Sequence, residues 1–332
     1  MTNVAPLVSV PGKLLLAGEY AVLEGAPAVV AAADVAGRGA NARFVPGLAP
    51  ASTVVAAAIT HARASLARTN FALPEGSAAV DTSAFMHGGI KLGLGSSAAA
   101  AVAAVSAAFA YAGRSLDEDR AAILDCAHRA HRAAQGGVGS GADIAASVLG
   151  GFVRICRDPD DPAGPPSTVP LAAASGLCLV PFWTGAAART VDFIGGVRRL
   201  GTTAPKIHAA RVAELAGAAE AFVDAFPRDA RAVVAAAARY GEAMRALGRD
   251  AALPIVVDAV ARSHDIAVAL GGAAKPSGAG GGDMGLGFFA DPEAARAFVA
   301  KCSGPVLVLD IRIGVTGASL AAPTVVKYFE KD

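Results

Sequence analysis

A lysine, an aspartate and a glycine-rich turn that carries two serines are the residues of this chain best suited to phosphate chemistry. The turn, Gly93–Ala98, leads directly into an alanine-rich run that predicts a helix at 97–112. Its glycines let the backbone approach a ligand, and the free N–H groups at the start of the helix attract an anion. The same pattern is also typical of a tight turn before a helix that one of the serines caps.

The lysine, Lys13, stands immediately before the apolar run Leu14–Ala17, which predicts a buried strand. A lysine at this place either lays its stem along apolar surface or points at an anion. The aspartate, Asp143, follows Ser140 by three residues, which fits a helix capping box. The glycines on both sides of Asp143 favour a functional role instead, because they allow a substrate to come close.

Together these residues match the needs of phosphoryl transfer from a nucleotide. That reaction requires a cradle for the phosphates with a divalent ion, a cation near the transferred group, and a carboxylate to orient or deprotonate the acceptor. The turn can be the cradle, with Ser96 or Ser97 as a hydroxyl ligand to Mg²⁺, while Lys13 supplies the cation and Asp143 the carboxylate. A further glycine-rich segment, Lys275–Asp283, abuts an apolar run, so it is either a flexible linker or a wall of the ligand site.

The elements that must position these residues alternate between strands and helices, which predicts an α+β fold. Apolar runs and turn signals predict strands at 14–17, 28–33, 79–85, 152–156, 177–183, 284–290, 306–313 and 324–328. Helical patterns cover 54–67, 97–112, 116–134, 140–150, 205–225, 229–246, 253–270 and 292–302. We expect two domains, at residues 1–183 and 184–332.

Composition narrows the class of protein. Hydrophobic residues make up 54% of the 332-residue chain and charged residues 17%, which allows a large buried core. The net charge of +1 argues against a nucleic acid or an anionic membrane as partner. The four cysteines form no Cys-x-x-Cys pair, and the first residues lack the pattern of a secretory signal. These features predict a cytoplasmic protein.

Three segments, Pro11–Gly25, Gly93–Ala99 and Lys275–Asp283, resemble the three ordered motifs of the GHMP kinases. That family includes galactokinase, homoserine kinase, mevalonate kinase and phosphomevalonate kinase. The resemblance spans nearly the whole chain. It implies an N-terminal domain with a left-handed βαβ crossover, a ferredoxin-like C-terminal domain, and a site for ATP and Mg²⁺ in the cleft between them.

Within this family the chain most resembles the phosphomevalonate kinases. Tyr20 stands where mevalonate kinases usually carry a histidine, and the segments 133–146 and 182–185, the latter followed by Thr190, are similar to those of phosphomevalonate kinases. The resemblance implies transfer of phosphate from ATP to 5-phosphomevalonate, which gives 5-diphosphomevalonate. Mevalonate kinase or another small-molecule GHMP kinase is the nearest alternative. A non-catalytic ligand-binding protein is the alternative from another class.

The resemblance also assigns roles to residues. Asp143 would be the base or orienting acid, Lys13 would neutralise the transferring phosphate, and Ser96 or Ser97 would touch Mg²⁺. The residues expected to bind ATP are Gly93, Leu94, Gly95, Ser96, Ser97 and Ala98. The residues expected to bind the acceptor are Tyr20, Lys91, Ser140, Thr184, Gly185, Arg189, Lys275, Ser277 and Gly278.

One position departs from the mevalonate kinase pattern. Those enzymes carry a metal-binding glutamate some eleven residues before the catalytic aspartate, whereas this chain reads His128–Arg132 there and contains no acid. The positive charge suits the phosphate of a phosphorylated acceptor. His131 and Arg132 can equally be solvated residues of a helix. For the oligomeric state we expect a monomer or a homodimer.

Overall fold

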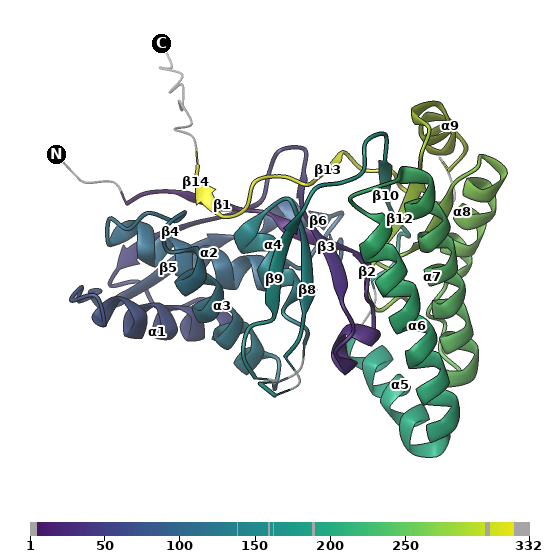
Figure 1. The fold of residues 1–332 in the computed structure, drawn as a ribbon. Helices are drawn as coiled ribbons and strands as arrows, with labels where there is room; N and C mark the ends of the chain where they lie inside the picture. The colour runs from purple at the N-terminus through teal and green to yellow at the C-terminus, as the bar shows by residue number, and fades with distance from the viewer. Residues whose placement is uncertain are drawn as a thin grey trace, which may run out of the picture.

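The computed structural model describes residues 5–137, 139–158, 160–161, 163–187, 190–302 and 306–321. Two groups of elements lie side by side in it (Figure 1). One group holds two antiparallel sheets with the helices α1 to α4, and the other holds a smaller sheet with α5 to α9. Strands and helices mix in both, as the α+β prediction requires.

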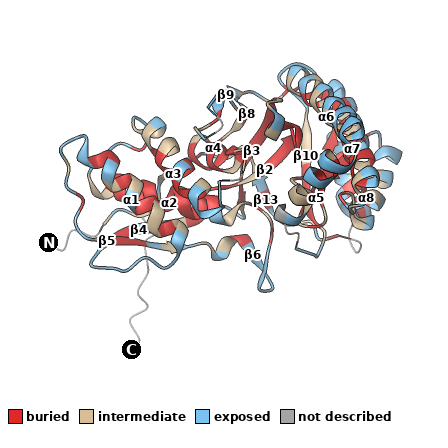
Figure 2. Ribbon diagram, turned by 90° about the horizontal axis from the view of Figure 1, so that it is seen from below, coloured by how far each residue is buried: buried red, intermediate tan, exposed pale blue. Residues whose placement is uncertain are grey.

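The first sheet of the N-terminal group has the strand order β14-β1-β4-β5. Its strands are β1 (Val8–Val10), β4 (Ala40–Pro46), β5 (Gly76–Asp81) and β14 (Ser319–Leu320). The helices α1 (Thr53–Ala67), α2 (Ser96–Tyr111) and α3 (Arg120–Ala134) pack together beside it. Every residue from Ala98 to Ala110 is buried, because small alanine side chains let neighbours approach α2 from all sides (Figure 2).

The second sheet positions the lysine and the aspartate. Its order is β13-β3-β8-β9, and β2 also pairs with β3. The strands are β2 (Gly12–Ala17), β3 (Ala28–Val35), β8 (Phe152–Cys156), β9 (Ser167–Leu171) and β13 (Ile311–Ile313). Helix α4 (Ala142–Leu149) packs on β2, β3 and β8. Lys13 on β2 and Asp143 on α4 therefore belong to one packed unit.

Short elements complete this half of the chain. Single 3₁₀ turns form at η1 (Ala21–Glu24) and η2 (Ser83–Phe85). A two-stranded hairpin of β6 (Met86–His87) and β7 (Ile90–Lys91) leads into the glycine turn.

The smaller sheet has the antiparallel order β10-β12-β11, with β10 (Cys178–Trp183), β11 (Ala273–Pro276) and β12 (Met284–Phe289). A bridge between Trp183 and Leu307 places the following segment beside β10. This arrangement is ferredoxin-like. The helices of this group are α5 (Thr190–Thr203), α6 (Pro205–Ala225), α7 (Ala230–Ala251), α8 (Asp258–Ala269) and α9 (Pro292–Cys302). The left-handed crossover of the N-terminal group stays a prediction.

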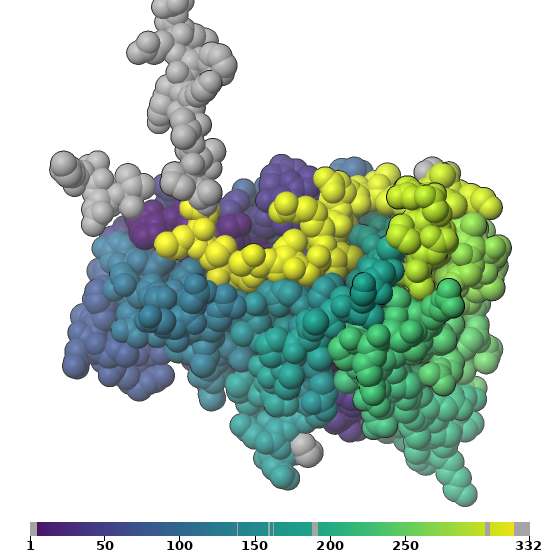
Figure 3. Space-filling model, turned by 45° about the horizontal axis from the view of Figure 1, so that its top comes forward, coloured from purple at the N-terminus to yellow at the C-terminus, as the bar shows by residue number. Residues whose placement is uncertain are grey.

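Strand pairing favours domain limits that differ from the expected boundary at residue 183. Strand β10 pairs with β12 and so belongs to the second group, although we placed it in the first. At the other end, β13 pairs with β3 and β14 pairs with β1, so the chain returns to the first group. In Figure 3 the yellow C-terminal segment runs along one face across both groups. We therefore propose that the N-terminal domain includes both ends of the described chain.

Several predicted elements have different limits in the structure. The strand expected at 79–85 ends at Asp81, and the helix expected from 253 begins at Asp258. Only Ile311–Ile313 of the strand expected at 306–313 forms a strand. The strand expected at 324–328 lies outside the described residues. Across the described part of the chain, no helix is long and apolar enough to cross a membrane.

Candidate active site

The glycine turn, the lysine and the aspartate line one cavity of about 610 Å³ between the two groups of elements. Its wall comes from β2, the turn at 93–98, one face of α3, the N-terminus of α4, and the glycine loop that ends at Asp283. Segments more than a hundred residues apart in the sequence thus meet in one place. The cavity contains the groups that phosphoryl transfer needs.

Lys13 and Asp143 both lie beside Gly95. A Cβ atom added to Gly95 would lie 3.2 Å from Cγ of Lys13 and 3.5 Å from Cβ of Asp143. The backbone N–H of Lys13 donates to the carbonyl oxygen of Leu94 at 2.8 Å, which fixes β2 against the turn. A Cβ atom on Gly278 would lie 3.8 Å from the ammonium nitrogen of Lys13. The lysine therefore spans from the turn to the glycine loop of the other group.

The capping box that we considered for Asp143 does not form. The N-cap of α4 is Gly141, with a φ of 77°. The hydroxyl of Ser140 accepts a hydrogen bond from the backbone N–H of Ala142 at 3.3 Å, and the Asp143 carboxylate accepts one from the N–H of Ile144 at 3.0 Å. Neither bond joins Asp143 to Ser140. The carboxylate lies in the first turn of the helix, where the helix dipole stabilises its negative charge.

The glycine turn has the backbone that its composition predicts. Gly93 and Gly95 have φ values of 79° and 76°, which an L side chain rarely adopts. Gly95 is the N-cap of α2 and no side chain caps that helix, so both serines stay in its first turn and line the cavity. Leu94 is 1% exposed and does not line the cavity. Its contribution is the carbonyl that holds Lys13.

Lys275 lies in the interior, in an ion pair with Glu19. Its ammonium donates to Glu19 Oε1 at 2.5 Å and to the carbonyl of Pro276 at 2.7 Å, and the two paired side chains are 0% and 1% exposed. Glu19 Oε1 also accepts the backbone N–H of Gly278 at 3.3 Å. Burial lowers the pKa of Lys275, and the Glu19 carboxylate opposes that shift. We therefore infer that Lys275 joins the two groups of elements and does not contact the acceptor, although we had expected that contact from the sequence.

Three other hydrogen bonds also join the two groups of elements. The backbone N–H of Leu15 donates to the hydroxyl of Ser277 at 3.0 Å. The hydroxyl of Tyr240 donates to the carbonyl of Glu19 at 2.7 Å, and that of Tyr20 donates to the carbonyl of Ala279. Burial, followed by the nearby Glu19 charge, raises the pKa of Tyr20. Tyr20 remains protonated at neutral pH and holds the glycine loop as a donor.

Some of the remaining predicted residues line the cavity, and others do not. Tyr20, Lys91, Ser140 and Gly278 line the cavity with the catalytic candidates, as do Gly93 and Ala98 of the turn. Ser277, Thr184 and Gly185 lie outside its lining. Arg189 falls outside the described residues.

The cavity also contains residues that we did not include among the predicted site residues. Asp283 closes the glycine loop, and a Cβ atom on Gly93 would lie 2.8 Å from its Oδ2. Glu19, His128 and His131 line the cavity as well, together with Arg132. The sequence signal for Asp283 is its place as the acid that ends the Lys275–Asp283 segment.

Mg²⁺ suits the donors on this wall. The ion prefers oxygen ligands and usually keeps several waters, with one or two carboxylates and the substrate phosphates as its other ligands. The hydroxyls of Ser96 and Ser97 and the carboxylates of Asp143 and Asp283 supply such oxygens around the turn. The described residues contain no cluster of three or more acids, histidines or cysteines, so an ion here would depend on the phosphates of the nucleotide.

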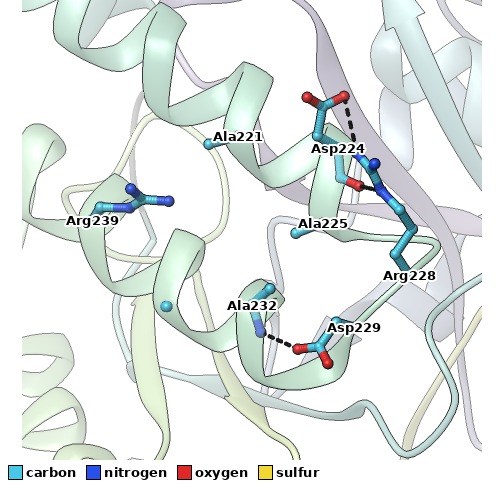
Figure 4. A pocket seen from close by; sticks show the side chains of 8 residues that line it. Ala221, Asp224, Ala225, Arg228, Asp229, Ala232 and Arg239 are labelled. Atoms are coloured by element: carbon cyan, nitrogen blue, oxygen red, sulfur yellow. Dashed lines mark hydrogen bonds and ion pairs between the residues drawn. The ribbon is translucent and has the colours of Figure 1, made fainter.

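A second hollow lies between α6 and α7 and is lined by four alanines and four charged residues (Figure 4). Three of its four charged residues, Asp224, Arg228 and Asp229, have structural partners. Arg228 and Asp224 lie 3.6 Å apart as an ion pair, and Asp229 accepts the backbone N–H of Ala232 at 2.6 Å to cap α7. We therefore place the candidate active site in the cavity around Lys13 and Asp143.

Comparison with known proteins agrees with the motifs. The family model for the GHMP kinases N terminal domain matches residues 67–151, and the model for GHMP kinases C terminal matches residues 232–305. A phosphomevalonate kinase of Streptomyces sp. (strain CL190) is 29% identical, and the match covers 86% of this chain and 90% of that protein.

Solved structures share the fold. The Lin0012 protein of Listeria innocua superposes with a TM-score of 0.82 at 23% identity, covering 94% of this chain and 99% of that one. Streptococcus pneumoniae phosphomevalonate kinase, in complex with phosphomevalonate and AMPPNP, gives a TM-score of 0.79 at 19% identity, with 92% and 99% covered.

Proposed function

Because the chain belongs to the GHMP kinase family, we propose that it transfers the γ-phosphoryl group of ATP to 5-phosphomevalonate and releases 5-diphosphomevalonate. The observation that carries the proposal is the placement of Lys13 and Asp143 together beside Gly95 of the glycine turn. The curated relative, a phosphomevalonate kinase, supports this choice of acceptor.

In the proposed reaction the turn binds the phosphates of ATP through backbone N–H groups at the start of α2. Lys13 neutralises the charge that develops on the transferring phosphoryl group, while the γ-phosphate moves from the oxygen of ADP to an oxygen of the acceptor phosphate. Asp143 orients that acceptor oxygen and accepts its proton where one is present. The acceptor phosphate is mostly ionised at pH 7, so orientation is the larger part of this role.

Mg²⁺ would be held by Ser96 or Ser97, with Asp143 or Asp283 as a nearby carboxylate. When bound, it neutralises phosphate charge. Tyr20, Lys91, Ser140 and Gly278 line the cavity and are the proposed contacts of the acceptor. The cytoplasmic location and the monomeric or dimeric state stay predictions.

The test incubates the protein with ATP, Mg²⁺ and either 5-phosphomevalonate or mevalonate, and follows the products by phosphorus NMR. We expect two coupled diphosphate signals from 5-phosphomevalonate and no product from mevalonate. Turnover of mevalonate but not of its phosphate would assign the chain to mevalonate kinase. Tight binding of both ligands without turnover would favour the non-catalytic alternative.

A further inference from the structure

We propose that Arg132 selects a phosphorylated acceptor by binding the acceptor's own phosphate during transfer. The inference rests on the proposed function, because only a phosphate acceptor brings two phosphate groups together in the cavity. The accepting hydroxyl of an alcohol is neutral, whereas an accepting phosphate monoester group carries close to two negative charges at pH 7. The site must compensate that additional charge before the γ-phosphate can approach.

Arg132 lies in the last turn of α3 and lines the same cavity as Lys13 and Asp143. Its side chain is half-buried and forms no ion pair or hydrogen bond with any described residue. Two other arginines of α3 do have anionic partners: Arg120 pairs with Asp117 and Arg129 pairs with Asp125. The arginine that faces the cavity is therefore the one whose charge is available, and a guanidinium fits two phosphate oxygens at once.

The preceding residue supplies a second, independent observation. His131 also lines the cavity and is 4% exposed, and its Nε2 has no hydrogen-bond partner among the described residues. A buried nitrogen without a partner costs free energy that a hydrogen-bonding ligand atom can recover. Arg132 and His131 thus provide a charge and a ring nitrogen that have no partners in the described part of the chain.

The packing of α3 brings this pair near the reacting groups. A Cβ atom on Gly141 would lie 2.8 Å from Nδ1 of His128, so α3 touches the N-terminus of α4 directly. Arg132 lies one helical turn beyond His128, and Asp143 lies in the first turn of α4. Burial, and then the charge of Arg132, lower the pKa of His128, which is consistent with Arg132 lying near this ring.

In this proposal Lys13 and Arg132 bind different phosphate groups. Lys13 lies against the glycine turn and serves the phosphoryl group of the nucleotide. Arg132 approaches from α3 and serves the phosphate of the acceptor. In this arrangement the two phosphates meet between two separate cations.

The experiment compares Arg132→Gln with Arg129→Gln, a matched control on the same helix whose arginine already pairs with Asp125. Steady-state kinetics are measured with 5-phosphomevalonate and ATP varied separately. For Arg132→Gln we expect kcat/KM for 5-phosphomevalonate to fall about 10- to 100-fold. This is the change that the loss of one hydrogen bond to a charged group produces. The KM for ATP should stay within about twofold. Arg129→Gln should match the wild type, and Arg132→Lys should recover part of the loss.

A raised KM for ATP with an unchanged KM for the acceptor would assign Arg132 to the nucleotide and overturn the proposal. Kinetics equal to the wild type would make Arg132 a solvated helix residue and overturn it as well. A binding measurement separates this proposal from the proposed function. Calorimetric titration with 5-phosphomevalonate, without nucleotide, should show weaker binding to Arg132→Gln even if the wild type gives no turnover, and equal binding would refute the role of Arg132.

Discussion

At the scale of single residues, the central feature is a lysine and an aspartate that both lie where a side chain on Gly95 would point. Lys13 forms no ion pair with any described residue, so its charge is available to a ligand. Asp143 is held by the N–H of Ile144 in the first helical turn. The pair therefore combines an available cation with an oriented carboxylate.

Replacement of Asp143 by Asn tests the carboxylate. We expect kcat to fall by about 100-fold or more with little change in the KM for ATP, because the acceptor oxygen loses its orienting base. Steady-state kinetics check this, with Asp125→Asn on α3 as a control outside the cavity. If transfer survives within about tenfold, which is about 1.4 kcal/mol of barrier, Asp143 is not the base.

Tyr20 should make the stability of the folded protein depend on pH in the alkaline range. Its side chain is 7% exposed, and burial raises its pKa above that of an unfolded tyrosine. Its contribution to stability is full below pH 10 and is lost as the pH rises toward the folded pKa, because the unfolded state loses the proton first. The wild type should lose up to about 1.4 kcal/mol per pH unit more than Tyr20→Phe above pH 10. Urea unfolding at several pH values measures this difference, and equal slopes would contradict it.

At the scale of elements, the turn before α2 depends on two glycines in the left-handed region. Gly95→Ala would place a Cβ atom 3.2 Å from Lys13 Cγ, whereas Gly113→Ala, at a φ of 71°, meets no atom within 4 Å. Both variants should lose about 1 kcal/mol of stability from backbone strain. Only Gly95→Ala should lose activity, by about tenfold or more, because Lys13 must move. Thermal unfolding and kinetics check both effects, and equal activity in the two variants would refute the role of the turn.

The buried Glu19–Lys275 pair joins β2 and its following turn to β11. Lys275→Met leaves a buried carboxylate without its cation and should cost about 3–5 kcal/mol of unfolding free energy. The double variant Glu19→Met with Lys275→Met should recover most of that loss, because no unpaired charge remains.

Activity should stay low in the double variant, because the N–H of Gly278 loses the carboxylate that holds it beside Lys13. Denaturant unfolding and kinetics separate stability from positioning. Activity that returns together with stability would show that the pair acts only on folding.

At the scale of the whole molecule, the chain crosses between the two groups of elements twice. Strands β13 and β14 complete the sheets begun by β3 and β1, and the Arg312 guanidinium contacts the Asp34 carboxylate at 2.9 Å across the β13–β3 pair. The cavity lies between groups that the chain itself ties together. This arrangement brings the glycine loop against the turn.

A chain that ends at Leu309 should therefore be strongly destabilised, although it retains all three motifs. It loses the pairing of β13 with β3 and of β14 with β1, which leaves two strand edges without partners. We expect a lower melting temperature or aggregation relative to the full chain, as measured by calorimetry and light scattering. A truncated chain with the melting temperature of the full chain would contradict the assignment of the C-terminal segment to the N-terminal domain.

The sequence alone determined the chemistry and much of the secondary structure. Glycine, serine, lysine and aspartate in fixed local patterns predicted a phosphate site, because capping, left-handed turns and helix dipoles act over a few residues. The same local rules placed α2, α4, α6 and α9 within one or two residues of their limits. They did not predict β4 or β9, because both segments have weak strand patterns. Pairing stabilises these strands instead: β4 has a neighbouring strand on both sides and β9 has one.

Only the tertiary structure decided which charges are available to a ligand. Lys13 and Asp143 are 130 residues apart and meet because α4 packs on β2, a contact that no local pattern encodes. Lys275 looks like a phosphate contact in the sequence, yet the fold buries it against Glu19. Arg132 looks like a solvated residue, yet it lines the cavity and pairs with none of the described residues. Whether a charged side chain is paired or free depends on what long-range packing brings beside it, and the order of residues along the chain does not contain that information on its own.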